Sequence, residues 1–232
     1  MPSGDSRILT GHISVPRSAR YSQLGEIGAA TREIWIVCHG YAQLAARFVR
    51  RFEPIASPDR VIVAPEALSR FYTERAPGEH STESQVGASW MTAEDREAEI
   101  ADYIRYLDAL GNAVLSPLQR SGVRLVALGF SQGTATVARW IANGVTKPDQ
   151  VILWAGGTPP ELDAAGAGRL AAGSPLIVVA AKRDEFIPKE RTAAEVARIG
   201  NFGLRYELIE FDGTHDIDPA TLRAIADRPP TA

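Results

Sequence analysis

The sequence is poor in cysteine and methionine and contains no long apolar run. Cys38 is the single cysteine in 232 residues, so an internal disulfide is excluded. The longest apolar runs, at residues 34–38 and 176–181, have five or six residues, whereas a membrane-spanning helix needs about 20. The amino terminus shows no basic segment followed by an apolar one, so we expect no secretory signal. These absences predict a soluble, cytoplasmic protein with no membrane span.

Neither sign of charge dominates the chain. It has 25 Lys and Arg against 28 Asp and Glu residues, a formal net charge of −3, and no basic cluster long enough to follow a phosphate backbone. We therefore expect no nucleic-acid partner. The zinc motif H-E-x-x-H, paired C-x-x-C motifs and the phosphate-binding loop G-x-x-x-x-G-K-[ST] are also missing, so the sequence predicts neither a metal nor another cofactor.

A series of short, continuous apolar runs indicates the fold class. The chain is 45% hydrophobic and 23% charged, and no linker or repeat divides it, so residues 1–232 are expected to form one domain. Runs rich in Val and Ile without polar alternation are typical of strands buried on both faces of a sheet. Such runs lie at residues 34–38, 61–64, 125–128, 151–155 and 176–181.

Amphipathic segments separate these runs and predict helices. Helices are expected after residue 44, over residues 92–110 behind a capping box of Thr92 and Asp95, over residues 132–143, after Pro188 and after Pro219. Residues 7–15 and 19–25 are expected to form an antiparallel hairpin, and residues 204–211 a last strand. The sum is an α/β fold with about eight mostly parallel strands and helices on both faces. In such folds ligands bind at the carboxyl ends of the strands.

The motif G-F-S-Q-G at residues 129–133 follows one of the predicted strands directly and opens the helix expected from Gln132. In this context G-x-S-x-G indicates a tight turn whose serine is held in a strained backbone conformation. Gly129 and Gly133 leave room for that turn because they have no side chain. The Ser131 hydroxyl then lies at a helix N-terminus, which favours a developing negative charge. We interpret Ser131 as a nucleophile; a glycine-lined turn with an unreactive serine is the alternative.

A serine nucleophile needs a base and a group that orients the base. His215 is the only histidine that follows Ser131 in the sequence, and it comes just after the last predicted strand. Asp184 follows the predicted strand at 176–181 by a few residues and is the preferred orienting acid, with Glu185 as its closest rival. The aspartates near the histidine in sequence are interpreted as turn and cap residues.

The first apolar run ends in the sequence Cys-His-Gly-Tyr. Gly40 allows the backbone to turn sharply and to direct the amide of Tyr41 into the crevice, where it would form an oxyanion hole with the amide of Gln132. His39 is expected to orient this loop rather than to act as the base, because it lies on a different strand from the serine. Cys38 is interpreted as a small buried side chain and not as a reactive thiol.

With these residues in this order, the chain resembles the α/β-hydrolase superfamily and, within it, the phospholipase/carboxylesterase family. The resemblance rests on G-F-S-Q-G, on the H-G pair after the first central strand, on D-x-x-x-P after a later strand, and on the order Ser131, Asp184, His215; it covers about residues 15–228. Trp90 looks like the family's tryptophan ahead of the long central helix. Residues 41–43 depart from the pattern, because family members usually carry a second glycine there. Dienelactone hydrolases share the fold but use a cysteine nucleophile, which Ser131 disfavours.

The resemblance implies a serine hydrolase that cleaves small-molecule carboxylic esters through an acyl-enzyme, with oxyanion amides from Tyr41 and Gln132. Two alternatives stay open at this point. One is an acyl thioesterase or lysophospholipase that uses the same triad, and the other is a non-catalytic binding protein with a hydrolase-like fold. A homodimer is compatible with the sequence, which leaves the oligomeric state open.

Residues 66–92 form a long stretch rich in Glu and Ser that is expected to be a flap over the crevice. Trp90 and Met91 on this flap, and Phe186 and Ile187 on the opposite wall, are expected to line an apolar acyl pocket of limited depth. Such a pocket predicts a preference for short to medium acyl chains. A solvated surface loop is the alternative for the flap.

Overall fold

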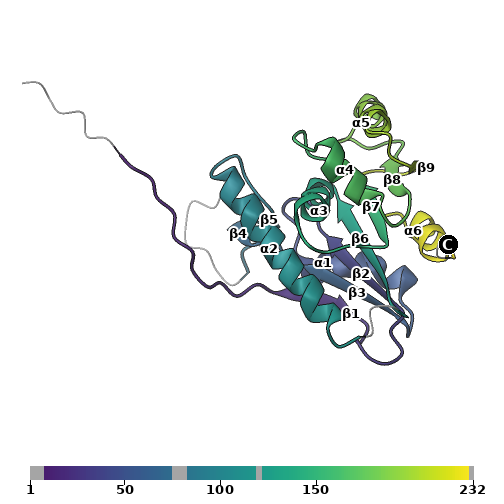
Figure 1. Cartoon of the computed structure of the whole chain (residues 1–232), viewed down its shortest axis with the longest axis horizontal. Helices are drawn as coiled ribbons and strands as arrows, with labels where there is room; N and C mark the ends of the chain where they lie inside the picture. Colours follow the sequence, from purple (N-terminus) through teal and green to yellow (C-terminus); the bar gives the residue numbers. More distant parts are fainter. Residues whose placement is uncertain (1–7, 75–82, 119–121, 230–232) are drawn as a thin grey trace, which may run out of the picture.

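A seven-stranded sheet forms the centre of the molecule (Figure 1). The computed structural model describes residues 8–74, 83–118 and 122–229. Within these ranges the strand order is β1-β3-β2-β6-β7-β8-β9, and β1 alone runs antiparallel to its neighbour. The strands are β1 (Tyr21–Leu24), β2 (Glu33–Cys38), β3 (Arg60–Pro65), β6 (Arg124–Phe130), β7 (Gln150–Trp154), β8 (Leu176–Ala181) and β9 (Tyr206–Phe211).

Helices cover both faces of the sheet, as the continuous apolar runs predict. Side chains of β2 alternate between two hydrophobic clusters, with Ile34 and Ile36 in one and Trp35 and Val37 in the other. The first cluster includes buried residues of α2 (Arg96–Leu115), α3 (Gln132–Asn143), α4 (Ala164–Leu170) and α5 (Lys189–Asn201). The second includes residues of α1 (Ala45–Phe48), the 3-10 helix η1 (Val49–Ile55) and α6 (Pro219–Ala226). Among the helices of the described ranges, none is long and apolar enough to cross a membrane.

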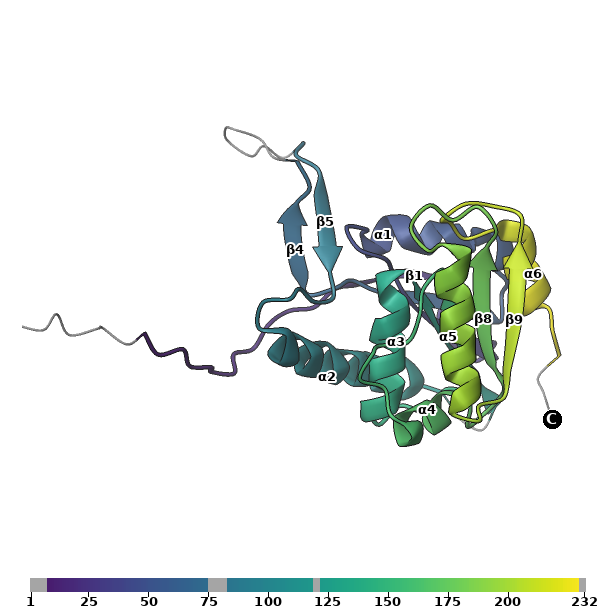
Figure 2. The ribbon, with the colours of Figure 1, turned by 90° about the horizontal axis from the view of Figure 1, so that it is seen from above.

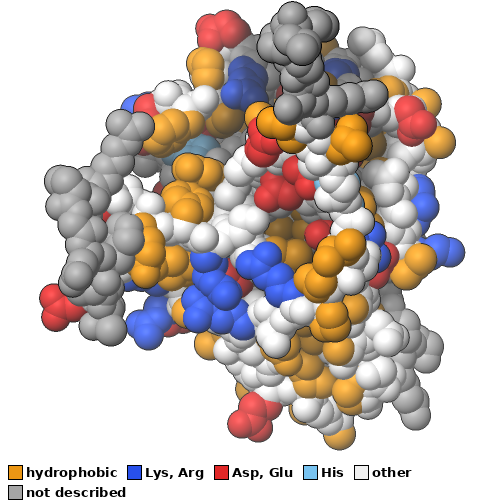
Figure 3. All heavy atoms as spheres, turned by 90° about the vertical axis from the view of Figure 1, so that its left-hand side faces the viewer, with side chains coloured by type: hydrophobic (Ala, Val, Ile, Leu, Met, Phe, Trp, Pro, Cys, Tyr) orange, Lys and Arg blue, Asp and Glu red, His pale blue; other side chains and the backbone are white. Residues whose placement is uncertain are grey.

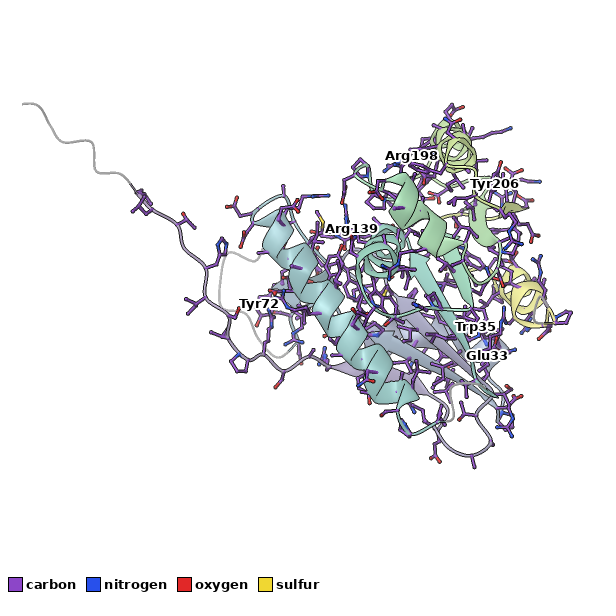
Figure 4. The ribbon with its side chains drawn as sticks, in the orientation of Figure 1. Glu33, Trp35, Tyr72, Arg139, Arg198 and Tyr206 are labelled. Atoms are coloured by element: carbon purple, nitrogen blue, oxygen red, sulfur yellow. The ribbon has the colours of Figure 1, made fainter. Side chains whose placement is uncertain are left out.

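The amino ends of the central strands are joined by a buried carboxylate. Glu33, labelled in Figure 4, lies at the start of β2. It binds Arg60 of β3 and, at 2.6 Å, Arg124 of β6. All three side chains are less than 20% exposed. Removing one partner from such a shielded set costs about 3–5 kcal/mol, because it leaves an unpaired charge in a poorly solvated place. These ion pairs hold the three strands in register at the edge opposite to their carboxyl ends.

A two-stranded hairpin, β4 (Ser69–Tyr72) and β5 (Val86–Ser89), extends past the edge at which β8 and β9 end (Figure 2). Its root is held by Glu66, whose side chain is 1% exposed and binds Arg20, Arg70 and the amide of Ala45. Burial alone would raise the pKa of Glu66, but hydrogen bonds from the two arginines hold it below its ordinary value. Lys and Arg side chains gather in the middle of the face seen in Figure 3, with acidic side chains around them.

Two details of the sequence-based fold were wrong. Residues 8–20 form no strand, so the predicted hairpin of residues 7–15 and 19–25 is absent from the described part of the chain. The short β1 pairs with β3 instead. The predicted capping box also fails, because Asp95 has φ +49 and makes no side-chain cap; Glu99 binds the amide of Thr92 at 2.6 Å.

Candidate active site

The turn between β6 and α3 places Ser131 at the carboxyl edge of the sheet. Its backbone has φ +53 and ψ −116, outside the regions that side chains favour, and such strain costs about 1–3 kcal/mol. Glycines on both sides make the turn fit: a Cβ on Gly129 would lie 2.2 Å from the Gly133 carbonyl oxygen, and one on Gly133 would lie 2.2 Å from the Cys38 oxygen. The Ser131 amide donates to the Trp154 carbonyl at 2.9 Å, which ties the turn to β7.

Three side chains from separate loops meet at this turn. His215 Nε2 lies 2.9 Å from Ser131 Oγ, and His215 Nδ1 lies 2.7 Å from Asp184 Oδ2. The second carboxylate oxygen of Asp184 accepts hydrogen bonds from the amides of Phe186 and Ile187 at 2.9 and 2.8 Å. Because the carboxylate can only accept, Nδ1 carries the proton and Nε2 is left to accept from the serine hydroxyl.

Burial and packing fix the two partners of the serine. The side chain of Asp184 is 2% exposed and that of His215 is 11% exposed. The imidazole lies between two aromatic rings, with centroid distances of 5.0 Å to Phe130 and 4.9 Å to Phe186. Glu185, the rival acid, is exposed to solvent. The geometry therefore brings together Ser131, His215 and Asp184 and leaves Glu185 outside.

His39 is fully buried beneath the loop that follows β2. Its Nδ1 donates to the Gly40 carbonyl at 2.7 Å, and its Nε2 accepts from the amide of Ala67 at 3.1 Å. Burial lowers the pKa of His39, so the ring is neutral at pH 7. Both ring nitrogens are engaged in holding backbone, which leaves none for a substrate. Burial also raises the pKa of Cys38, whose thiol stays protonated within β2.

The two amides expected to form an oxyanion hole belong to Tyr41 and Gln132. Among the described residues, neither amide donates a hydrogen bond to a protein acceptor. Ala42, the residue after Tyr41, has φ +60. This is the left-handed conformation that glycine adopts at little cost, so an alanine here carries the strain that a second glycine would avoid. Gln43 Oε1 accepts from the amide of Gly40 at 2.8 Å and closes the loop.

The predicted pocket residues lie in different surroundings. Trp90 is a buried core residue, 2% exposed, and so presents little surface to a substrate. Its ring is tilted by 35° to that of His39, with 5.2 Å between the centroids, and its Nε1 donates to the His39 carbonyl. Met91 is partly buried, with its sulfur 3.6 Å from Arg139. Phe186 is 65% exposed beside the imidazole. Ile187 lines a cavity of about 10 Å³ next to Asp184, which holds no more than a water molecule.

The described part of the predicted flap contacts the loop that carries Tyr41, which the sequence did not indicate. Its strand β5 contacts the loop of Tyr41 and Ala42 through Gly87 and Ala88. The only signal in the sequence is the run of small residues at 87–89, which is equally typical of an edge turn. The tip at residues 75–82 lies outside the described residues. No cluster of three or more His, Cys, Asp or Glu able to hold a metal occurs in the residues that the structure describes.

Comparison with known proteins supports the fold. No family model and no curated protein matches this sequence. Among solved structures, acyl-protein thioesterase 2 of Zea mays aligns with a TM-score of 0.67 at 16% identity, over 90% of this chain and 96% of the other. A phospholipase/carboxylesterase from Dyadobacter fermentans gives 0.61 at 14% identity, over 92% and 97%. Esterase PE8 gives 0.56 at 17% identity, over 90% and 97%. The chain thus has the α/β-hydrolase fold.

Proposed function

We propose that this protein is a serine hydrolase that cleaves small-molecule carboxylic esters. The observation that carries the proposal is the continuous set of hydrogen bonds from Ser131 through His215 to Asp184, with distances of 2.9 and 2.7 Å. A nucleophile, a base within reach and a third group that orients the base are what activates a serine hydroxyl at neutral pH. The fold shared with solved esterases and a thioesterase agrees with this chemistry.

In the acylation step, Ser131 Oγ attacks the ester carbonyl carbon while His215 Nε2 takes the hydroxyl proton. The carbonyl oxygen becomes an oxyanion, which the amides of Tyr41 and Gln132 stabilise. Collapse of the tetrahedral intermediate breaks the bond to the alcohol oxygen, and the imidazolium gives its proton to the leaving alkoxide. The acyl group remains on Ser131 as an ester.

In the deacylation step, His215 removes a proton from water, which attacks the acyl carbon. A second oxyanion forms between the same two amides, and its collapse returns the proton to Ser131 Oγ and releases the carboxylic acid. Asp184 stays ionised throughout and stabilises the imidazolium that forms twice in the cycle.

We propose short to medium acyl chains as the substrates. Phe186 presents an exposed ring beside the imidazole, where it would contact one arm of the ester. The cavity next to Asp184 and Ile187 is far too small for an acyl chain. We propose that the acyl chain instead lies across the exposed ring of Phe186 at the sheet edge.

Thioesters are a second candidate class, favoured by the fold shared with an acyl-protein thioesterase. The same attack would release a thiolate, which needs less help from the imidazolium because a thiol has a pKa of about 8.5. The two classes therefore differ in their dependence on proton donation by His215 and not in the nucleophile.

A hydrolysis panel tests the proposal. It contains p-nitrophenyl esters from acetate to palmitate, an acyl thioester and a peptide amide, and it compares wild type with Ser131→Ala. We expect wild type to cleave the short esters and Ser131→Ala to lose this activity. Faster cleavage of the thioester than of the matched ester would favour the second class. Absence of any Ser131-dependent turnover would contradict the proposal in favour of a non-catalytic binding protein.

A further inference from the structure

We propose that the β4–β5 hairpin holds the two oxyanion-hole amides at their working separation, and that Gly87 and Phe71 are positioning residues for the reaction. This inference rests on the proposed function, because it assigns a task to the structure around the same site. The hairpin extends past the carboxyl edge of the sheet (Figure 2), and Tyr72, the last residue of β4, is labelled in Figure 4.

Backbone hydrogen bonds join the hairpin to the loop that carries Tyr41. The amide of Ala42 donates to the Ala88 carbonyl at 2.9 Å, and the amide of Ala88 donates to the Gln43 carbonyl at 3.2 Å. The loop is therefore paired with β5 in an antiparallel bridge. Ala42 has φ +60, and an alanine remains in that conformation only where its surroundings impose it. Strand β5 supplies this constraint.

Gly87 is what permits the close approach of strand and loop. A Cβ on Gly87 would lie 2.7 Å from both the Cα and the carbonyl oxygen of Ala42, closer than real Cβ contacts. Phe71 pairs with Gly87 across the hairpin, and its ring stacks on the ring of Tyr41 at 5.3 Å and 28°. The ring of Phe71 on β4 and the backbone of β5 thus both contact the loop that carries Tyr41.

The other end of the same segment holds the second amide. The Gln132 side chain accepts from the amide of Trp90 at 3.2 Å and donates to Ser89 Oγ and to the Met91 carbonyl, both at 3.1 Å. Residues 87–91 therefore contact the loop of Tyr41 at one end and the residue that follows the nucleophile at the other. The distance between the two oxyanion donors is set by one short stretch of chain.

This arrangement has a kinetic consequence. The oxyanion exists only in the tetrahedral intermediate and the transition states around it, so a displaced donor weakens transition-state binding and leaves substrate binding unchanged. A displacement of 1 Å is enough to slow a reaction about 100-fold. The signature of a disturbed hairpin is a fall in kcat at constant KM.

The test compares Gly87→Ala with Gly28→Ala, a glycine whose added Cβ would meet nothing within 4 Å. We measure kcat and KM on p-nitrophenyl acetate and the inhibition constant of a trifluoromethyl ketone, whose tetrahedral adduct carries an oxyanion. Gly87→Ala is expected to lower kcat about 100-fold with KM within about twofold, and to weaken the ketone by the same factor as kcat/KM. Gly28→Ala should match wild type in all three values.

If Gly87→Ala fails to fold, Phe71→Leu decides, because it removes the ring stack on Tyr41 and keeps an apolar side chain at an exposed strand. A folded Phe71→Leu enzyme should lose about 5-fold in kcat, within the range of a lost aromatic contact. Wild-type kcat in a folded Gly87→Ala or Phe71→Leu variant would overturn the inference. An inactive wild type would instead refute the proposed function, so the two failures are distinguishable.

Discussion

Ser131 and Ala42 both have positive φ at the carboxyl edge of the sheet, and their turns are stabilised in different ways. At Ser131 the room comes from Gly129 and Gly133, which lie two residues away on either side. At Ala42 a glycine lies two residues before, Gly40, but none follows it in the turn, and the loop is also held by Gly87 and Ala88 on a separate hairpin. Strain at the first turn is accommodated locally, and strain at the second depends on tertiary structure.

This difference between the two turns determines which of them can be predicted from the sequence. A turn supported by its own neighbours appears as a motif, and G-F-S-Q-G is such a motif. A turn stabilised by residues remote in sequence shows no motif. Its only sign in the sequence is an unexpected residue type, here an alanine where a glycine is usual. The conformation of the Ala42 loop can therefore be disturbed by substitutions far from it in sequence. The conformation of the Ser131 turn depends on the glycines that flank it.

The largest effect is expected from removing the groups that the Ser131 turn positions. Ser131→Ala and His215→Ala should each lower kcat by about 10⁴-fold or more, and the double variant should be little worse than either, because the two act as a unit. Steady-state kinetics on the short esters measures this. Additive losses in the double variant would contradict a shared mechanism.

Next comes the acid that sets the tautomer of His215. Asp184→Asn should lower kcat by about 10⁴-fold while the fold is kept, because the amide favours the wrong imidazole tautomer. Glu185→Gln is the matched control and should have little effect, since Glu185 is exposed and does not reach the ring. A near-wild-type kcat for Asp184→Asn would refute the role of Asp184.

A substitution at Gly133 tests the locally supported turn. Gly133→Ala gains about 1 kcal/mol of helix propensity, but its Cβ would lie 2.2 Å from the Cys38 carbonyl oxygen. Overpacking of this kind costs about 1–3 kcal/mol or more, so the variant should be less stable to urea than wild type. Gly168→Ala in α4, whose Cβ would meet nothing within 4 Å, should be neutral or stabilising. Equal unfolding midpoints for the two variants would contradict the steric account.

The pH dependence of His39 tests the remotely supported loop. Its pKa in the folded protein is lowered by burial, so the unfolded chain binds the proton more readily. Stability from the neutral ring is therefore full above the ordinary pKa of 6.5 and declines as the pH falls below it, by at most about 1.4 kcal/mol per pH unit. NMR titration of the imidazole should find the Nδ1–H tautomer and a midpoint below 6.5. A midpoint above that value would contradict the neutral, loop-holding histidine.

The smallest effect is expected at the strained alanine. Ala42→Gly removes a left-handed penalty of about 1–2 kcal/mol and adds about 0.4–1 kcal/mol of chain entropy to the unfolded state. The net change is a gain of up to about 1.6 kcal/mol in unfolding free energy. Ala56→Gly, at φ −61, is the control and should destabilise. Equal losses in the two variants would show that Ala42 carries no strain.

Sequence patterns predicted the parts of the molecule that depend on neighbouring residues. The apolar runs of β2, β6, β7 and β8, the bounds of α3, and the loops that carry Asp184 and His215 follow from continuous burial and from the glycine-flanked serine. The parts that depend on partners remote in sequence were missed. Residues 8–15 have a strand-like pattern but no partner strand, and the indole of Trp90 is buried by His39 and Tyr103, which no local pattern reveals.

Covalent labelling of Ser131 tests the central claim most directly. Wild type is incubated with a fluorophosphonate at pH 7.5, and intact-mass spectrometry followed by peptide mapping locates the adduct. The account predicts a single phosphonyl adduct on Ser131, its absence in Ser131→Ala, and strongly slowed formation in His215→Ala, because the hydroxyl then lacks its base. An unlabelled wild type, or equal labelling of wild type and Ser131→Ala, would contradict a serine nucleophile at this turn.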